Sequence, residues 1–295
     1  MDSSCEVVFY HHSGFTAAVG DCMAVFDYWE GGEAGLAEEK KLTAARLSGY
    51  KYVYVFTSHT HPDHLDPVIY SWEAESPVTY IAPFDAHVGM RGRRMAPGDS
   101  MDLHEGVRVK AFASTDTGVC YLVDLYGVQV FHAGDLNLWH WREESTLREI
   151  EAAENAFEAA LASMAGEQVD IAMFPVDPRQ GALFDVGANR FILSMKPKVF
   201  IPMHWQGRRE VAAEFARRAA NKATGVYALT LPRERIVVRF EGGVMNIEVY
   251  QQEEPPPAAA QTEQKAEQTY GGNLLSGEDP FTDSDMPVEL GGKDG

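Results

Sequence analysis

Residues 56–67 read FTSHTHPDHLDP and place three histidines and one aspartate within six consecutive positions. The residues before them, Tyr50–Phe56, are rich in aromatic and β-branched side chains, which predicts a buried strand that ends where the histidines begin. On an extended loop, His59 and His61 project to the same side, and a turn at the following proline can bring Asp63–His64 to the same point. Imidazole nitrogen and carboxylate oxygen are ligands that zinc accepts, so the spacing indicates a metal site.

A plainer interpretation is that this loop is a polar turn whose histidines bind water or nearby backbone. A single histidine would favour that interpretation, but three histidines and an aspartate directly after a strand favour a metal site. The spacing H-x-H-x-D-H also resembles the signature of the metallo-β-lactamase superfamily of hydrolases. The resemblance implies a four-layer αβ/βα sandwich, in which two mixed β-sheets are flanked by helices. It also implies a divalent cation, with Zn²⁺ as the first choice, as one or two ions, and Mn²⁺ or Fe²⁺ as alternatives.

The composition divides the chain into two parts. The chain has 295 residues, of which 45% are hydrophobic, and this is enough for one large core. From Gln251 onward the sequence changes to Glu, Pro, Ala, Gln, Gly and Asp, which bury too little apolar surface to offset chain entropy. We therefore predict a metallo-β-lactamase-like domain over residues 1–250 and an acidic disordered tail over residues 251–295.

The net charge is strongly negative, with a formal value of −19. The tail contributes −8 through ten acidic residues and two lysines, and the domain keeps −11. Both parts repel phosphate backbones, which disfavours a role in nucleic-acid processing. We expect a small-molecule substrate, no nucleic-acid partner and no membrane partner, and the sequence leaves the oligomeric state open.

The cysteines and the first residues bear on the compartment. Cys5, Cys22 and Cys120 are widely spaced and form no C-x-x-C pair, which indicates reduced thiols in the core. The first residues show no basic start and no apolar run of signal-peptide length, and no segment reaches about 18 consecutive apolar residues. We therefore expect a cytoplasmic protein.

Hydrophobic periodicity predicts a mixed α/β chain. Strands are expected at Cys5–Tyr10, Thr16–Asp27, Tyr50–Phe56, Val78–Ala82, Val107–Ala113, Val119–Leu125, Val128–His132, Val169–Phe174, Val199–Met203, Arg235–Phe240 and Val244–Tyr250. Helices are expected at Gly31–Gly49, Asp66–Glu75, Ser145–Ala165, Val186–Met195 and Arg208–Asn221. The last two strands are expected to form a hairpin through Gly242 and Gly243. The pattern alone indicates mixed sheets, and the resemblance adds the four-layer sandwich.

Two further positions end predicted strands as the histidine loop does. Asp135 follows Gly134 after the strand that ends at His132, and His204 follows the strand that ends at Met203. By itself a Gly-Asp pair is typical of a helix N-cap, and a single strand-end histidine is more often a core residue than a ligand. The superfamily resemblance implies instead that Asp135 bridges two metal ions and that His204 is the final histidine ligand.

The resemblance implies two neighbouring metal sites. One comprises Asp63, His64 and His204 with Asp135, and the other comprises His59 and His61 with Asp135 and a third ligand. The superfamily supplies a histidine as that third ligand, but the corresponding residues 113–118 contain none. Asp116 can donate a carboxylate oxygen in its place. The sequence therefore leaves open whether both sites fill.

Other side chains near these positions suggest how a substrate is held. The candidates for apolar walls are Trp139, Trp141 and Trp205, although a Trp-His-Trp run also suits a packed corner. Arg179 can hold a carboxylate or phosphate through its planar guanidinium, or it can form a surface ion pair with Asp177.

Two segments extend the resemblance beyond the histidine loop. Gly-Asp-Leu-Asn at residues 134–137 and Phe-Pro-Val-Asp-Pro-Arg at residues 174–179 are similar to segments of a bacterial branch of the superfamily, and the similarity covers most of Tyr10 to Trp205. His11 and His12 in the first turn can line the same mouth, but we expect turn histidines to be exposed to solvent.

These observations predict an enzyme, a metallo-hydrolase with the metallo-β-lactamase fold that acts on a small, anionic ester, lactone or phosphoester. A bound divalent ion lowers the pKa of water towards ~7 and polarises the oxygen under attack, and Asp63 can orient that water or accept its proton. The alternative is a non-catalytic metal-binding or scaffold protein with a degenerate first metal site. A ribonuclease of the same superfamily is disfavoured by the net charge and by the lack of a Lys/Arg-rich segment near the motifs.

Overall fold

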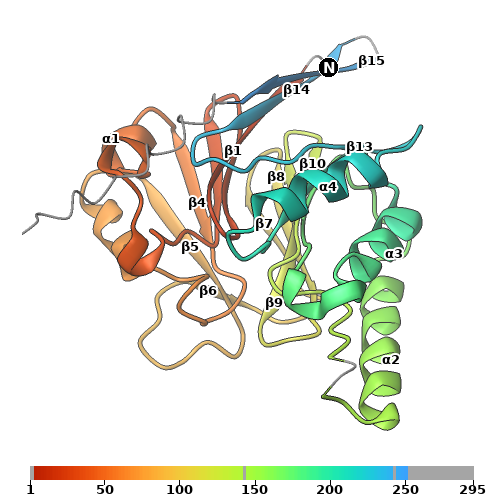
Figure 1. The fold of residues 1–295 in the computed structure, drawn as a ribbon. Coiled ribbons are helices and arrows are strands. Elements are labelled where there is room, and N and C mark those ends of the chain that lie inside the picture. Colours follow the sequence, from red (N-terminus) through yellow and green to blue (C-terminus); the bar gives the residue numbers. More distant parts are fainter. Residues whose placement is uncertain (1–2, 142–143, 242–243, 252–295) are drawn as a thin grey trace, which may run out of the picture. The chain divides into compact units, whose positions relative to one another are not determined.

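Two β-sheets form the centre of the fold in the computed structural model, which describes residues 3–141, 144–241 and 244–251 (Figure 1). The first sheet has eight strands in the order β15-β14-β1-β2-β3-β4-β5-β6. Their bounds are β1 (Ser3–His11), β2 (Gly14–Val19), β3 (Cys22–Phe26), β4 (Tyr52–Phe56), β5 (Val78–Pro83), β6 (Arg93–Met95), β14 (Arg235–Glu241) and β15 (Val244–Tyr250). The chain thus returns to this sheet after building the second one.

The second sheet has seven strands in the order β13-β12-β11-β10-β9-β8-β7. Their bounds are β7 (Ser100–His104), β8 (Val107–Ala113), β9 (Val119–Leu125), β10 (Val128–His132), β11 (Ile171–Pro175), β12 (Val199–Met203) and β13 (Gly225–Val226). Strands β4, β11 and β12 are apolar and buried almost throughout, as strands covered on both faces must be.

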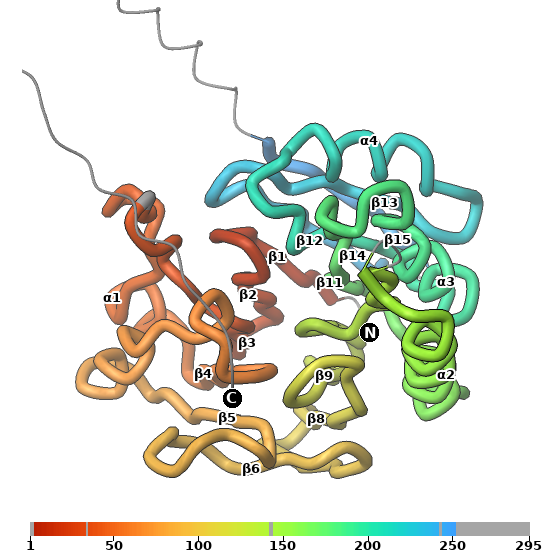
Figure 2. The backbone as a smooth tube through the Cα atoms, turned by 60° about the horizontal axis from the view of Figure 1, so that its bottom comes forward, coloured from red at the N-terminus to blue at the C-terminus, as the bar shows by residue number. Residues whose placement is uncertain are grey.

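Helices cover the outer face of each sheet (Figures 1 and 2). Beside the first sheet lie α1 (Ala44–Leu47) and the 3₁₀ segments η1 (Gly32–Ala34), η2 (Glu38–Lys40) and η3 (Pro67–Ala74). Beside the second sheet lie α2 (Leu147–Ser163), α3 (Val186–Met195), α4 (Arg209–Ala219) and the 3₁₀ segment η4 (Pro178–Leu183). The predicted four-layer αβ/βα sandwich is therefore confirmed.

Two apolar clusters hold these layers together. The larger one joins the facing sides of the two sheets, through aromatic rings such as Phe26, Phe56 and Tyr121, and continues to the helices of the second sheet. The smaller one packs Leu47 and Trp72 against the outer face of the first sheet. Burying one large apolar side chain contributes roughly 1.5–3 kcal/mol to the free energy of folding. The packed layers therefore form a rigid support for the loops at the sheet edges.

The three cysteines are free and buried, as predicted. Burial raises the pKa of each thiol, Cys5, Cys22 and Cys120, to about 12. They remain protonated at neutral pH and pack as small apolar side chains. Across residues 3–141, 144–241 and 244–251 we find no helix that is long and apolar enough to cross a membrane.

Strand direction decides where the loops meet. Strands β3 to β6 pair in parallel in the first sheet, and β10 to β13 pair in parallel in the second. Since β1 and β3 both pair antiparallel with β2, β1 runs in the same direction as β3. The carboxyl ends of β1, β3 and β4 therefore share one edge of the first sheet, and those of β10 to β12 share one edge of the second.

The sequence-based elements differ from the structure in the first fifty residues. The single strand predicted at Thr16–Asp27 was wrong, because Gly20 adopts φ 58° and turns the chain between β2 and β3. The helix predicted at Gly31–Gly49 was also wrong, because Gly31, Gly32 and Gly35 have positive φ and break it into 3₁₀ turns and the one-turn α1.

Most later elements match the predicted ranges to within a few residues, and β6, β7, β13 and η4 were missed. The hairpin predicted for β14 and β15 is confirmed by their antiparallel pairing, and its turn at Gly242 and Gly243 lies outside the described residues. The predicted tail also lies outside them, apart from Gln251.

Candidate metal centre

Polar side chains gather where strands of both sheets end. On the first sheet these are His12 after β1, Asp27 after β3 and His59 after β4, and on the second sheet they are Asp135, Asp177 and His204 after β10, β11 and β12. All of them are buried, between 0% and 8% exposed. Burying a polar group costs free energy unless the group is paired, so the partners of these side chains indicate the function of the site.

Asp27 fixes the orientation of the histidine loop. One carboxylate oxygen accepts the Ser58 backbone N–H at 2.7 Å, and the other accepts the Ser58 hydroxyl at 2.6 Å and His64 Nδ1 at 2.8 Å. The Ser58 hydroxyl oxygen lies 2.9 Å from His59 Nδ1. Because this hydroxyl donates its own hydrogen to Asp27, it accepts a hydrogen bond from the His59 Nδ1–H. Both imidazole rings therefore carry hydrogen on Nδ1 and turn Nε2 towards the site, where a metal ion can bind it in place of a proton.

His204 is oriented in the same way from the second sheet. Its Nδ1 donates to Asp177 Oδ2 at 2.8 Å, so its Nε2 also faces the site. Asp177 is completely buried and is held from the other side by the guanidinium of Arg179, which donates to both carboxylate oxygens at 2.6–3.0 Å. The chain Arg179–Asp177–His204 thus links an exposed arginine to a buried ring.

The carboxylate of Asp135 lies at the meeting point of these rings. Its Oδ1 is 3.2 Å from His64 Nε2 and 3.3 Å from His204 Nε2, and its Oδ2 is 3.6 Å from His59 Nε2. Nε2 of His59 and His64 and Oδ1 of Asp135 are buried without a hydrogen-bond partner. Nitrogen lone pairs and an anionic oxygen that face one another repel unless a proton or a metal ion lies between them, and imidazole nitrogen with carboxylate oxygen is a donor set that fits a divalent metal ion.

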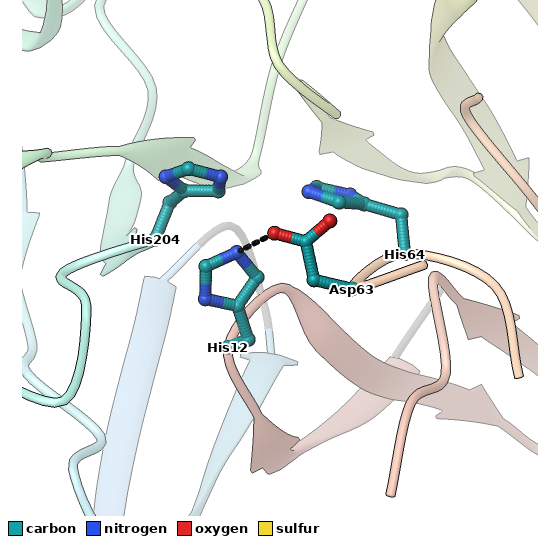
Figure 3. Close-up of side chains that lie close together, drawn as sticks. All are labelled: His12, Asp63, His64 and His204. Atoms are coloured by element: carbon teal, nitrogen blue, oxygen red, sulfur yellow. Dashed lines mark ion pairs between the residues drawn. The ribbon is translucent and has the colours of Figure 1, made fainter. Parts of the chain in front are cut away.

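Ligand atoms converge in two groups within the part of the chain that the structure describes. His12, Asp63, His64 and His204 form one group (Figure 3), and His59, His61 and Asp135 form the other, with the potential ligand atoms of each group within 4.8 Å of one another. A third combination, Asp27 with His59 and His64, shares their rings. Because Asp27 already accepts three hydrogen bonds, it orients these rings rather than competing for the ion.

Sequence reasoning missed the position of His12. We expected an exposed turn residue, but His12 is 8% exposed, and its Nε2 lies 3.2 Å from Asp63 Oδ2. His11 is half-buried and packs against Trp29 with ring centroids 4.9 Å apart. The direction of the first strand could have indicated this position. Because β1 runs in the same direction as β3, His12 after β1 lies at the edge of the sheet where the histidine loop lies.

Burial and neighbouring charges set the protonation of the centre. Burial lowers the pKa of His12 and of His59 to about 4, so both rings are neutral at pH 7. Burial also opposes protonation of His64, but the carboxylates of Asp135 and Asp27 outweigh it and raise the pKa of His64 to about 10. In the metal-free protein, a proton on His64 thus takes the place of a cation.

The carboxylates respond in the opposite direction. Burial opposes ionisation of Asp135, but His64 and His204 outweigh it and hold the pKa well below the usual range. Burial likewise opposes ionisation of Asp63, and His12 and His64 lower its pKa in spite of it. Both groups stay ionised at neutral pH, which suits a metal ligand.

The backbone at the centre is held in unusual conformations. His12, Asp27 and His204 have φ of 54°, 41° and 58°, in the left-handed region that side chains rarely adopt. The loops are tied across the sheets by His204 N–H donating to His12 O at 3.3 Å. Such strain persists only where the surroundings enforce it, and it concentrates at functional sites.

A pocket of about 350 Å³ opens beside Asp135. It is lined by His61, Asp63, Thr115, Asp116, Asp135, Trp139, Trp141, Arg179 and His204. The indole rings of Trp139 and Trp141 stack with centroids 5.6 Å apart and planes 6° apart, and Trp139 Nε1 donates to Asp135 O at 2.9 Å. An apolar wall therefore adjoins the Asp135 carboxylate.

Two predicted site residues lie apart from the clusters. Asp116 is exposed on the rim of the pocket and accepts the Thr117 N–H at 2.8 Å, and it belongs to neither ligand group among the described residues. Trp205 is 7% exposed and packs in the core against Phe9, with ring centroids 5.9 Å apart, so the structure does not bring it to the pocket wall.

Comparison with known proteins gives solved structures only, since no family model and no curated protein matches the chain. A metallo hydrolase from the hyperthermophilic archaeon Ignicoccus hospitalis has TM-score 0.59 at 16% identity, covering 81% of this chain and 100% of that one. A candidate metal-dependent hydrolase from Parabacteroides distasonis has TM-score 0.54 at 16% identity, covering 78% and 94%. The diiron β-hydroxylase CmlA from Streptomyces venezuelae has TM-score 0.52 at 12% identity, covering 80% of this chain and 54% of CmlA.

These similarities concern the fold. They agree with the two mixed sheets and their flanking helices, so the chain has the metallo-β-lactamase fold that the histidine spacing predicted. At this level of identity, function has to be argued from the site itself.

Proposed function

We propose that this protein is a metal-dependent hydrolase of a small, anionic ester, lactone or phosphoester. The observation that supports it most is the convergence of Nε2 atoms from His59, His64 and His204 on the Asp135 carboxylate, where those of His59 and His64 are buried without a hydrogen-bond partner. A divalent cation supplies a Lewis acid and lowers the pKa of bound water towards ~7. The similarity to two proteins described as metal-dependent hydrolases agrees with this reaction class.

The chain's own residues have separate tasks in this proposal. His59, His61 and His64, with Asp63, Asp135 and His204, would hold the ions, and Asp27, Ser58 and Asp177 keep the rings in the required tautomer. Trp139 and Trp141 would exclude water from one side of the substrate and fix its orientation. Asp63 would orient the attacking water or accept its proton at a carboxylate oxygen.

The donor set also bears on the metal. Imidazole nitrogen and carboxylate oxygen, without thiolate, suit Zn²⁺ and also Mn²⁺ or Fe²⁺. We propose Zn²⁺ as one or two ions, and the diiron neighbour CmlA keeps Fe²⁺ as the alternative.

The proposal for an anionic substrate rests on charge. A chain with a formal charge of −19 repels a polymeric anion over its whole surface. Arg179 reaches the pocket with its side chain 53% exposed, and among the described residues no hydrogen bond is made by its Nη1. That nitrogen would bind one carboxylate or phosphate oxygen of a small molecule while the rest of the guanidinium stays on Asp177. We accordingly propose no nucleic-acid or membrane partner, and a cytoplasmic location stays a prediction.

An activity screen tests the proposal. Protein purified without chelator would be assayed on a phosphodiester, a phosphomonoester, a lactone, and a matched pair of anionic and neutral carboxylic esters. We expect turnover of at least one anionic member, loss of turnover with chelator, and recovery when metal is returned. If protein shown to contain metal turns over none of these classes, the alternative of a non-catalytic metal-binding or scaffold protein is favoured instead.

A further inference from the structure

The first turn of the chain places a histidine where the superfamily resemblance assigned none. We propose that His12 is a metal ligand, which closes one site with four protein side chains: His12, Asp63, His64 and His204. This inference rests on the metal-binding part of the proposed function and is independent of the reaction.

The geometry around His12 is that of a shared coordination point. Its ring centroid lies 4.1 Å from that of His204 and 5.4 Å from that of His64, and the rings of His64 and His204 lie 5.5 Å apart. The Asp63 carboxylate lies among the three rings (Figure 3). Three imidazole nitrogens and one carboxylate oxygen that converge on one point make a donor set that zinc accepts.

A hydrogen bond from His12 to Asp63 explains the contact less well. His12 Nε2 is buried, and although Asp63 Oδ2 is 3.2 Å away, the nitrogen makes no hydrogen bond of acceptable geometry. His64 Nε2 in the same group is unpartnered as well. Two buried nitrogens that point at one place without a hydrogen-bond partner fit a shared cation better than a hydrogen bond.

The backbone places His12 as firmly as the other ligands. Its carbonyl accepts the His204 N–H, and the carbonyl of the next residue, Ser13, accepts His132 Nε2 at 2.8 Å. His132 is completely buried and stacks on Phe26 at an interplanar angle of 3°. The first turn is thereby tied to β10 and β12 of the opposite sheet, which pre-organises the His12 ring.

The two groups of ligands then differ in kind. The His12 group offers four protein ligands, whereas His59, His61 and Asp135 offer three, and His61 is exposed. A site with more protein ligands is expected to hold its ion more tightly, and a site with fewer protein ligands leaves a position for exchange. We therefore assign the tightly held ion to the His12 group and the exchangeable ion to the His59 group.

Metal titration of the full-length chain tests this assignment. Metal-free protein would be titrated with Co²⁺ and Zn²⁺, following visible absorption for Co²⁺ and competition with a chelator for affinity. The wild type should show one tight and one weaker ion. His12→Ala should weaken the tight class by at least about 100-fold, because even outer-shell changes cost 10–100-fold. His59→Ala should remove the weaker class, and the neighbouring His11→Ala should change neither.

Two measurements separate a ligand from a residue that positions Asp63. His12→Gln retains a hydrogen-bond donor but loses the imidazole, so it should lose the tight class and shift the Co²⁺ spectrum as His12→Ala does. Wild-type affinity and an unchanged spectrum in His12→Gln would overturn the proposal. In wild-type protein with isotope-labelled histidine, loaded with a cadmium isotope suited to NMR, we expect direct coupling from the metal to His12 Nε2. This measurement needs no variant to fold, and absence of coupling at His12 with coupling at His64 and His204 would also overturn the proposal.

The outcome is distinguishable from failure of the proposed function. A protein that shows this coupling and both affinity classes, yet hydrolyses none of the substrates above, would retain the His12 assignment and lose the reaction.

Discussion

His59, His64 and His204 are each oriented by a neighbouring side chain at Nδ1. Asp27 accepts a hydrogen bond from His64 Nδ1 directly and orients His59 through the Ser58 hydroxyl, and Asp177 accepts a hydrogen bond from His204 Nδ1, so that Nε2 of each ring faces the site. The residue types at the centre could be predicted from the sequence because the spacing in the histidine loop gave His59, His61, Asp63 and His64, and the superfamily resemblance added Asp135 and His204. Asp27 and the role of Asp177 could not, because a lone aspartate after a strand has no distinctive spacing.

The difference between His204 and Asp116 gives the first prediction. His204 has a buried Nε2 facing Asp135, whereas Asp116 is exposed on the pocket rim. His204→Ala should weaken metal binding by at least about 100-fold, the upper end for outer-shell changes, and Asp116→Ala should change it little. Metal content after dialysis measures both. If Asp116→Ala emptied the protein of metal while His204→Ala did not, the allocation of residues to the two sites would be wrong.

Arg179 carries the second prediction, which concerns substrate charge. If its Nη1 binds the substrate anion, Arg179→Ala should raise KM for the anionic ester about tenfold or more and leave kcat for the neutral ester nearly unchanged. Arg179→Lys should recover only part, because an ammonium cannot pair with Asp177 and an anion in the same geometry.

Metal content is the control for that experiment, since Arg179 also holds Asp177 and so supports His204. Equal losses on both esters, together with lower metal content, would show that Arg179 acts only through the Asp177 ion pair, and the substrate-anion role would be dropped.

The protonation of His64 gives the third prediction. Neighbouring carboxylates raise its pKa in the folded, metal-free protein to about 10, above the ordinary 6.5. An ion must displace this proton, so metal affinity should rise with pH between about 6.5 and 10, by up to about tenfold per pH unit. Without metal, the same proton stabilises the folded state below pH 6.5, and this contribution is lost as pH rises through 10.

Calorimetric titration in two buffers of different ionisation enthalpy measures the effect. At pH 7 about one proton should be released per ion bound to the His12 group. Metal binding with no buffer dependence at pH 7 would mean that His64 is already neutral in the metal-free protein.

At the scale of elements, the centre depends on loops from one sheet docking on the other. Gly118, between β8 and β9, approaches the histidine loop so closely that an added Cβ would lie 2.0 Å from Ser58 O and 2.7 Å from His59 Cβ. The Val119 N–H donates to that same Ser58 carbonyl at 3.0 Å. The segment where the superfamily supplies a histidine here acts as a support for the histidine loop.

Gly118→Ala is therefore the fourth prediction. Its φ of +76° and the overlap with Ser58 should together cost more than about 2 kcal/mol of unfolding free energy and weaken metal binding at the His59 group. Gly98→Ala is the matched control, because Gly98 has φ +92° with nothing within 4 Å, and it should cost only about 1 kcal/mol. Urea unfolding and metal titration measure both variants, and equal costs would refute the close-packing explanation.

The elements themselves show what a single sequence reveals. Strands such as β8, β9 and β12 were predicted with their observed bounds, because short runs of apolar and β-branched residues are typical of buried strands. The helix expected before β4 failed because good helix formers were counted while three glycines at positive φ were not. Short β6 and β7, whose residues apart from Met95 are exposed or half-buried, carry too little hydrophobic pattern to be recognised.

At the scale of the whole domain, the metal centre exists only because two sheets meet at one edge. Asp27 and His59 come from the first sheet, Asp135 and His204 come from the second, and hydrogen bonds between the loops hold them together. Strand pairing across such sequence distances cannot be obtained from local pattern, and only the family resemblance supplied it. His12 was misjudged for that reason, because its neighbours in space lie about 50 to 190 positions along the chain.

The most direct test of the account is elemental analysis of the full-length protein, purified without chelator and then reconstituted with Zn²⁺, Mn²⁺ or Fe²⁺. The account predicts between one and two divalent ions per chain, with no more than a trace in a His64→Ala/His204→Ala double variant that keeps a wild-type circular dichroism spectrum. A folded wild-type protein that retains none of the three metals after reconstitution would contradict it.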